Sequence, residues 1–203
     1  MMTLDYTRWG EIDHAAEPHA FVRYLDTVSG LDAIQRIKQL TYELLDIRAG
    51  HTLLDVGCGA GDDVKALALV VGPTGRVVGV DGSQIMLAEA RARLHDANLP
   101  IELVVGNAEQ LDFASDTFDG CRAERVFVHL KHPERAVAEM TRVVRSGGHV
   151  VVYDADWETL VVDAPDRAVT PWQERVSGIQ ASARGGVVRV RVPKTVPCWA
   201  AGR

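Results

Sequence analysis

Short runs of β-branched and apolar residues alternate with stretches of helical periodicity between His51 and Asp156. This alternation constrains the fold more than any other feature, because strands that are separated by helices pair in parallel. The sequence therefore predicts an α/β fold, with a doubly wound, mostly parallel sheet and helices on both of its faces. Five runs are expected to form the strands, namely residues 52–56, 76–80, 101–105, 118–123 and 149–153.

Two stretches show the clearest helical spacing of apolar residues. Residues 134–144 are expected to form a helix that Ser146-Gly147-Gly148 ends, with one apolar face made of Ala136, Val137, Met140, Val143 and Val144. Before the first strand, a further amphipathic helix is expected from the spacing of Leu31, Ile34, Ile37, Leu40 and Leu44.

The balance of charge changes along the chain. Residues 167–203 carry seven basic residues and one acidic residue, whereas the preceding part carries 15 basic and 27 acidic residues. Leucine is absent beyond Leu160, and Gly, Pro and Val become frequent. We therefore divide the chain into an N-terminal helical attachment (1–50), an α/β core (51–160) and an atypical C-terminal tail (161–203).

Composition excludes several classes of protein. With 203 residues, 47% of them hydrophobic, the chain can bury a core, so global disorder is excluded. The absence of a long apolar run and of a signal peptide predicts a cytoplasmic protein without a membrane span. Three scattered cysteines form neither a disulfide framework nor a metal site, so no metal is expected. The net charge of −6 disfavours nucleic acid as the partner.

A glycine-rich loop follows the first expected strand, where open parallel sheets bind their ligands. Its residues, Asp55-Val56-Gly57-Cys58-Gly59-Ala60-Gly61-Asp62, alternate glycine with other types, so the backbone can turn sharply and approach a ligand. The third glycine of the dinucleotide fingerprint is replaced by Asp62, which disfavours a phosphate. A tight turn without a ligand is the alternative interpretation.

Asp81 ends the second expected strand, 20 residues beyond Gly61. A carboxylate at this place can accept hydrogen bonds from both hydroxyls of a ribose. Together with the loop, it predicts a ligand that carries a ribose without a phosphate. Alternatively, Asp81 caps the turn or the helix that follows.

These residues resemble the class I S-adenosylmethionine-dependent methyltransferases, especially the small-molecule group that includes ubiquinone and menaquinone C-methyltransferases. The resemblance spans residues 30–160. It rests on the glycine loop and on Val80-Asp81-Gly82-Ser83, Met86-Leu87, Gly106-Asn107-Ala108-Glu109, Phe118-Asp119, and Glu139 to Gly148.

The resemblance implies a Rossmann-like fold and S-adenosylmethionine as the cofactor. It places the amino-acid end of the cofactor at the glycine loop, the ribose at Asp81, and the adenine against Met86, which otherwise is an ordinary core residue. Asn107 stands where the family commonly has Asp, and weaker binding is expected. The full set of expected cofactor-binding residues is Asp55, Gly57, Gly59, Gly61, Asp81, Gly82, Met86, Asn107, Ala108 and Glu124.

Methyl transfer from a sulfonium needs alignment and a dry pocket rather than a covalent nucleophile. Where the acceptor must lose a proton, His129 is the candidate general base and Glu124 the second, although packing alone also explains His129. The acceptor is expected to be a small apolar or aromatic metabolite that is methylated at carbon or oxygen. An aromatic-rich N-terminal stretch is expected to form a lid over the acceptor or else a helix buried on the core, and it contains Tyr6, Trp9, His14, His19, Phe21 and Tyr24. After the fifth strand, the residues expected to line the acceptor pocket, or else to form a solvated loop, are Asp154, Asp156 and Trp157.

The tail leaves alternatives open. The family continues with a helix and an antiparallel strand pair, and only a helix over 168–179 and an edge strand over 187–192 can be assigned here, so the pair is expected to be incomplete or altered. One alternative is therefore an inactive, truncated protein that still binds the cofactor and exposes the edge of its fifth strand to a second chain. An RNA methyltransferase and an NAD-dependent dehydrogenase are further alternatives.

Overall fold

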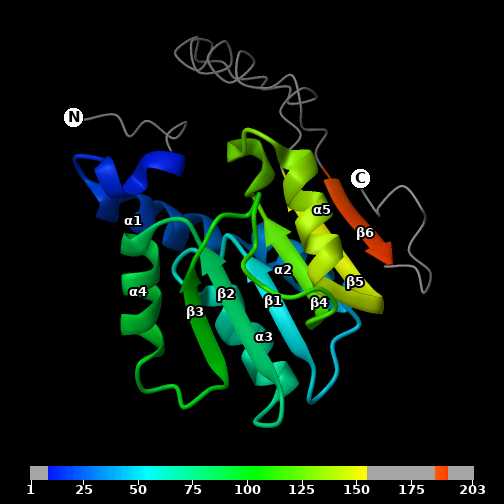
Figure 1. The fold of residues 1–203 in the computed structure, drawn as a ribbon. Coiled ribbons are helices and arrows are strands. Elements are labelled where there is room, and N and C mark those ends of the chain that lie inside the picture. Colours follow the sequence, from blue (N-terminus) through cyan, green and yellow to red (C-terminus); the bar gives the residue numbers. More distant parts are fainter. Residues whose placement is uncertain (1–8, 155–185, 192–203) are drawn as a thin grey trace.

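The computed structural model describes residues 9–154 and 186–191. Its centre is a six-stranded sheet in the order β3-β2-β1-β4-β5-β6 (Figure 1). The first five strands are parallel, and β6 is antiparallel to β5. The strands are β1 (Thr52–Val56), β2 (Arg76–Asp81), β3 (Ile101–Val105), β4 (Phe118–Glu124), β5 (Val144–Asp154) and β6 (Gly186–Arg191).

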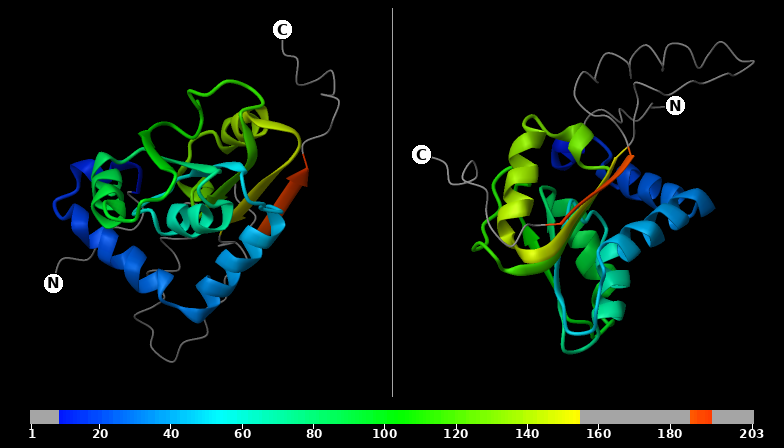
Figure 2. Two further views of the ribbon diagram at one scale, coloured as in Figure 1. Left: turned by 90° about the horizontal axis from the view of Figure 1, so that it is seen from below. Right: turned by 90° about the vertical axis from the view of Figure 1, so that its right-hand side faces the viewer.

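Helices cover both faces of the sheet, as the doubly wound prediction requires (Figure 2). Neighbouring strand residues alternate between two buried clusters, since Leu53 belongs to the cluster with α3 and Leu54 to the cluster with α5. The helices are α1 (Pro18–Ser29), α2 (Asp32–Leu44), α3 (Asp62–Val71), α4 (Gln84–Leu94) and α5 (Pro133–Val143), with short 3-10 helices η1 (Trp9–His14) and η2 (Phe127–His129).

The amphipathic faces of two helices differ from the prediction. Leu31, directly before α2, is 53% exposed and Leu40 of α2 is 43% exposed, whereas Lys38 and Thr41 are buried. The predicted apolar stripe was wrong at these positions because α2 covers charged side chains, which the spacing of leucines does not reveal. The helix expected over 134–144 instead runs from Pro133 to Val143, and Val137 is exposed.

The break expected at Ser146-Gly147-Gly148 lies inside β5, where the pairing with β4 shifts in register and Gly147 has a φ of 88°. At its end, β5 pairs with β6 from His149↔Arg191 to Asp154↔Gly186. The edge strand expected over 187–192 is therefore confirmed within one residue. This pairing contradicts the simple form of the truncation hypothesis, which required a free edge on β5. The helix expected over 168–179 lies outside the described residues.

Candidate functional site

The loop from β1 to α3 has the backbone shape that its glycines predicted. Gly57, Gly59 and Gly61 all have positive φ, at 72°, 50° and 87°. The amides of Gly57 and Cys58 donate to the carbonyl of Val80, at 2.7 and 3.0 Å, and so tie the loop to the end of β2. A methyl group on Gly57 would lie 2.2 Å from Cγ2 of Val126, so only glycine fits beside the loop that follows β4.

Asp81 joins this loop to the start of α4. Its Oδ2 accepts from the amide of Gly59 and its Oδ1 from the amide of Ser83, both at 2.8 Å. Burial raises the pKa of Asp81, while these two amide donors act against the rise. Ser83, and not Asp81, caps α4, because its Oγ accepts from the amide of Met86 at 3.1 Å. Each oxygen of Asp81 keeps a lone pair for a further donor, as a ribose site needs.

The N-terminal segment, which consists of η1 and α1, packs beside Asp81, against the start of α4. Asp13 accepts from the hydroxyl of Ser83 and from the amides of Gln84 (2.9 Å) and Ile85 (3.3 Å). A small apolar cluster holds the segment in place, and it contains Ile12, Phe21, Val22 and Met86. Met86 is thus a core residue of this cluster, and the expected contact with adenine stays a prediction.

An aromatic group connects the same segment to the end of β4. The ring of Trp9 lies 5.0 Å from that of Phe21 and 5.8 Å from those of Tyr24 and His129. Desolvation and the nearby guanidinium of Arg125 lower the pKa of His129, although the residue as a whole is exposed. His129 is therefore neutral at pH 7 and able to accept a proton.

The loop after β3 lies next to β2. The amide of Gly106 donates to the carbonyl of Asp81 at 3.0 Å. Asn107 is exposed and its Oδ1 accepts from the amide of Glu109, while Ala108 is buried in the core. A methyl group on Gly82 would lie 3.8 Å from the carbonyl oxygen of Gly106, which is an ordinary contact distance. The structure thus brings the expected adenine-side residues to the same edge of the sheet as Asp81.

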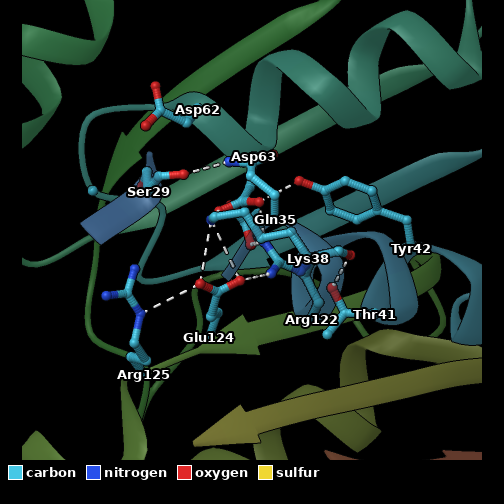
Figure 3. Close-up of polar contacts among 12 residues, drawn as sticks. Ser29, Gln35, Lys38, Thr41, Tyr42, Asp62, Asp63, Arg122, Glu124 and Arg125 are labelled. Atoms are coloured by element: carbon cyan, nitrogen blue, oxygen red, sulfur yellow. Dashed lines mark hydrogen bonds and ion pairs between the residues drawn. The ribbon is translucent and has the colours of Figure 1, made fainter. Parts of the chain in front are cut away.

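A buried cluster of charged side chains lies behind the glycine loop, under α2 (Figure 3). Its centre is Arg122 of β4, which is 1% exposed. The Arg122 guanidinium contacts Asp55 at 3.1 Å, Asp63 at 3.2 Å and Glu124 at 2.6 Å, and it lies 5.4 Å from the ring centre of Tyr42. The expected cofactor residues Asp55 and Glu124 therefore have cationic partners within the protein.

Lys38 of α2 completes this cluster. Its Nζ pairs with Asp63 and lies 3.2 Å from Oε1 of Glu124. The hydroxyl of Tyr42, also on α2, donates to Asp63. Glu124 receives one more ion pair, at 3.3 Å, from Nε of Arg125. We name Lys38, Tyr42, Asp55, Asp63, Arg122 and Glu124 the ionic cluster.

The pKa values of Asp55 and Asp63 are shifted in opposite directions, because their charged neighbours differ although both side chains are buried. Burial, reinforced by Asp63 and Glu124, raises the pKa of Asp55 to about 7 despite its contact with Arg122. For Asp63, burial alone would raise the pKa, but Arg122 and Lys38 hold it well below the usual range. Burial and the neighbouring Asp63 raise the pKa of the Tyr42 phenol. Near pH 7 the cluster thus keeps Asp63 ionised while Asp55 titrates.

Sequence reasoning missed Lys38, Tyr42, Asp63 and Arg122. The available signal was Arg122 itself, a charged residue inside a run expected to be a buried strand. Asp154, expected to line a pocket or a solvated loop, is instead buried and accepts from the amides of Phe127 (2.7 Å) and Val128 (3.2 Å). Asp156, Trp157 and Tyr6 lie outside the described residues.

The strand order, the glycine loop and Asp81 at the carboxyl ends of the strands are typical of class I S-adenosylmethionine-dependent methyltransferases. A family model described as "Methyltransferase domain" matches residues 54–152, and this segment belongs to that family. S-adenosylmethionine is the cofactor of the class, and the resemblance seen in the sequence is confirmed.

Three similar proteins show how far the likeness extends. The chain is 40% identical to an uncharacterised 37.1 kDa protein in a transposon of Streptomyces fradiae, and the match covers 79% of this chain and 46% of that protein. It is 35% identical to the ubiquinone/menaquinone biosynthesis C-methyltransferase UbiE of Cupriavidus pinatubonensis, and this match covers 72% of the chain and 63% of that protein. The crystal structure of the YcgJ protein from Bacillus subtilis matches 60% of this chain and 51% of its own, with a TM-score of 0.56 and 27% identity. The chain thus spans about half to two thirds of these proteins.

No helix in 9–154 is long and apolar enough to span a membrane. In the described part of the chain, no group of three or more His, Cys, Asp or Glu side chains could hold a metal ion.

Proposed function

We propose that the chain binds S-adenosylmethionine at the glycine loop and transfers its methyl group to a small-molecule acceptor. The observation that carries the proposal is the position of Asp81, whose carboxylate is held by the amides of Gly59 and Ser83 at the end of β2. A carboxylate in this position suits the hydroxyls of a ribose, in S-adenosylmethionine as in NAD, and Asp62 in place of the third glycine of the dinucleotide fingerprint favours S-adenosylmethionine.

The residues at this edge of the sheet fit this cofactor. Gly57, Gly59 and Gly61 would follow its amino-acid end, since their backbone lacks the Cβ atoms that would obstruct a close approach. Asp81 would accept from the ribose, with Gly82 beside it. The adenine would face Asn107, Ala108 and Met86. The ionic cluster behind the loop would support the cofactor site through Asp55 and Glu124.

When bound, the cofactor supplies a methyl group on a positively charged sulfur. The protein therefore has to align the acceptor with that methyl group and keep water away. We assign the second task to the N-terminal segment, because Trp9, Phe21 and Tyr24 form an aromatic group that lies against His129. This segment would act as the lid that the sequence suggested.

His129 is the proposed general base for acceptors that lose a proton. Its imidazole borders the aromatic group, where an apolar acceptor would lie, and its lowered pKa leaves it free to accept a proton at pH 7 while making it a weak base. Glu124 suits this role less well, because it is buried and pairs with three cations. We therefore retain His129 and give Glu124 a role in the cofactor site.

The acceptor we propose is a small apolar or aromatic metabolite, methylated at carbon or oxygen. The likeness to a ubiquinone/menaquinone C-methyltransferase and the acidic character of the chain before residue 167 support this choice over RNA. A cytoplasmic location, association with a second copy and the division of the chain at residues 50 and 160 stay predictions.

Calorimetric titration with S-adenosylmethionine, with its demethylated product and with NAD tests the cofactor. We expect the first two to bind and NAD not to bind, and preferential binding of NAD would instead indicate a dehydrogenase. Incubation with cofactor that is labelled in the methyl group, in extracts of small metabolites and of RNA, tests the acceptor. Label in RNA alone would contradict the small-molecule acceptor, and cofactor binding without any transfer would support the inactive alternative.

A further inference from the structure

The ammonium of Lys38 is buried, with only 6% of the side chain exposed, although it belongs to the N-terminal helix α2. Burying an unpaired ammonium is costly, and the ion pairs with Asp63 and Glu124 offset this cost. Lys38 lies outside the segment 54–152 that the family model matches, whereas both partners lie inside it. The attachment and the methyltransferase domain thus share one buried charge network.

The two partners of Lys38 belong to two different segments next to the glycine loop. Asp63 is the second residue of α3, directly after Gly61 and Asp62. Glu124 ends β4 and precedes Arg125, which has a φ of 57°. Val126 follows, and it packs against Gly57. Figure 3 shows Lys38 reaching between the two carboxylates.

We propose that Lys38 is a positioning residue for the cofactor site. By pairing with Asp63 and Glu124, Lys38 keeps the glycine loop and the loop after β4 in the arrangement that encloses the amino-acid end of S-adenosylmethionine. The proposal rests on the function proposed above. It adds that helix α2 takes part in cofactor binding without touching the cofactor.

The physical argument is one of charge balance. Asp55, Asp63 and Glu124 bring three carboxylates into one buried space, and Arg122 alone contacts all three. Without Lys38, Arg122 is the one remaining cation of the described residues that contacts both Asp63 and Glu124, so their repulsion is offset less and the two segments that carry them move apart. Binding of the cofactor would then have to bring them together again. By linkage, a cofactor that favours the assembled site also stabilises the docked position of α2.

The direct test compares three variants at one exposed and one buried position of α2. Lys38→Met removes the charge and keeps much of the side-chain length, Lys38→Arg keeps the charge, and Arg36→Met is a control at an exposed residue of the same helix. Affinity for S-adenosylmethionine is measured by calorimetry at a temperature where circular dichroism shows each variant to be folded. We expect about a tenfold loss for Lys38→Met, recovery to within about threefold for Lys38→Arg, and no change for Arg36→Met.

A purely structural role for Lys38 gives a different result. Folded Lys38→Met would then melt at a lower temperature and bind the cofactor as tightly as the wild type, which would overturn the proposal. If Lys38→Met does not fold, the double variant Lys38→Met/Asp63→Asn replaces it, because it removes both charges of the pair. Wild-type affinity in the double variant would equally overturn the proposal.

Hydrogen exchange of the wild-type chain supplies a test that needs no variant. S-adenosylmethionine is expected to slow exchange of the amides in α2, while those in α5, on the opposite face of the sheet, serve as the internal reference. Binding by calorimetry without slower exchange in α2 would contradict the inference and leave the proposed function intact. A wild-type chain that binds no S-adenosylmethionine would contradict both.

Discussion

The carboxylates at the end of β2 and those behind the glycine loop are held in two different ways. Asp81 is held by backbone amides of Gly59 and Ser83, both within the same methyltransferase segment. Asp55, Asp63 and Glu124 are held by side-chain cations, and one of these, Lys38, comes from a helix outside that segment. Backbone donors come with the local fold, whereas side-chain donors depend on what the rest of the chain brings.

Replacing Arg122 should have the largest effect. Arg122→Met leaves Asp55, Asp63 and Glu124 without their shared partner, and a broken buried ion pair costs about 3–5 kcal/mol. The exposed pair between Arg76 and Glu102 provides the control, because Arg76→Met should cost about 1 kcal/mol or less. Urea unfolding, followed by circular dichroism, measures both. Equal losses in the two variants would show that the ionic cluster does not stabilise the fold.

Replacing Asp81 should act on binding. Asp81→Ala removes the acceptor for two ribose hydroxyls, and since hydrogen bonds to a charged group contribute about 1.5 kcal/mol each, affinity for S-adenosylmethionine should fall about 100-fold. Asp112, which is exposed, provides the matched control Asp112→Ala. Titration calorimetry decides the outcome, and wild-type affinity in Asp81→Ala would remove Asp81 from the cofactor site.

Replacing Asp55 should change how stability depends on pH. The pKa of Asp55 is about 7 in the folded chain, against 3.8 for the ordinary group, so between pH 4 and pH 7 the folded state holds a proton that the unfolded state has lost. The free energy of unfolding of the wild type should therefore fall relative to Asp55→Asn as the pH rises through this range, by at most about 1.4 kcal/mol per pH unit.

Urea unfolding of both proteins at several pH values measures this difference. Taking the difference cancels the contributions of other groups, such as His129, whose lowered pKa acts in the opposite direction. Above pH 7 the difference should become constant. A difference that does not change with pH would mean that Asp55 is ionised throughout.

Removing the cap of α4 should have the smallest effect, because it acts on the region held by backbone contacts. Ser83→Ala loses the bond from the amide of Met86 and the contact with Asp13, and a lost N-cap costs about 1 kcal/mol. The exposed Ser115 provides the control Ser115→Ala, which should change the free energy of unfolding by less than about 0.5 kcal/mol. A loss as large as that of Arg122→Met would erase the contrast between the two regions.

The sequence by itself determined the parts of this protein that depend on local pattern. The strands Thr52–Val56 and Ile101–Val105 were predicted residue for residue, because β-branched runs bounded by turn residues specify strands. The shape of the glycine loop and the place of Asp81 followed in the same way, since glycine adopts a positive φ without steric cost and a parallel sheet presents the ends of its strands on one edge.

Only the tertiary structure decided which charges are buried together. Leucine spacing predicted that α2 buries Leu31 and Leu40, yet the helix buries Lys38 and Thr41 and leaves both leucines exposed. Lys38 and Glu124 are 86 residues apart in the chain, and no local pattern links them. A buried charge is stable only where a partner of opposite sign meets it, and that meeting depends on how α2, α3 and β4 pack, which is a property of the folded chain and of no single segment.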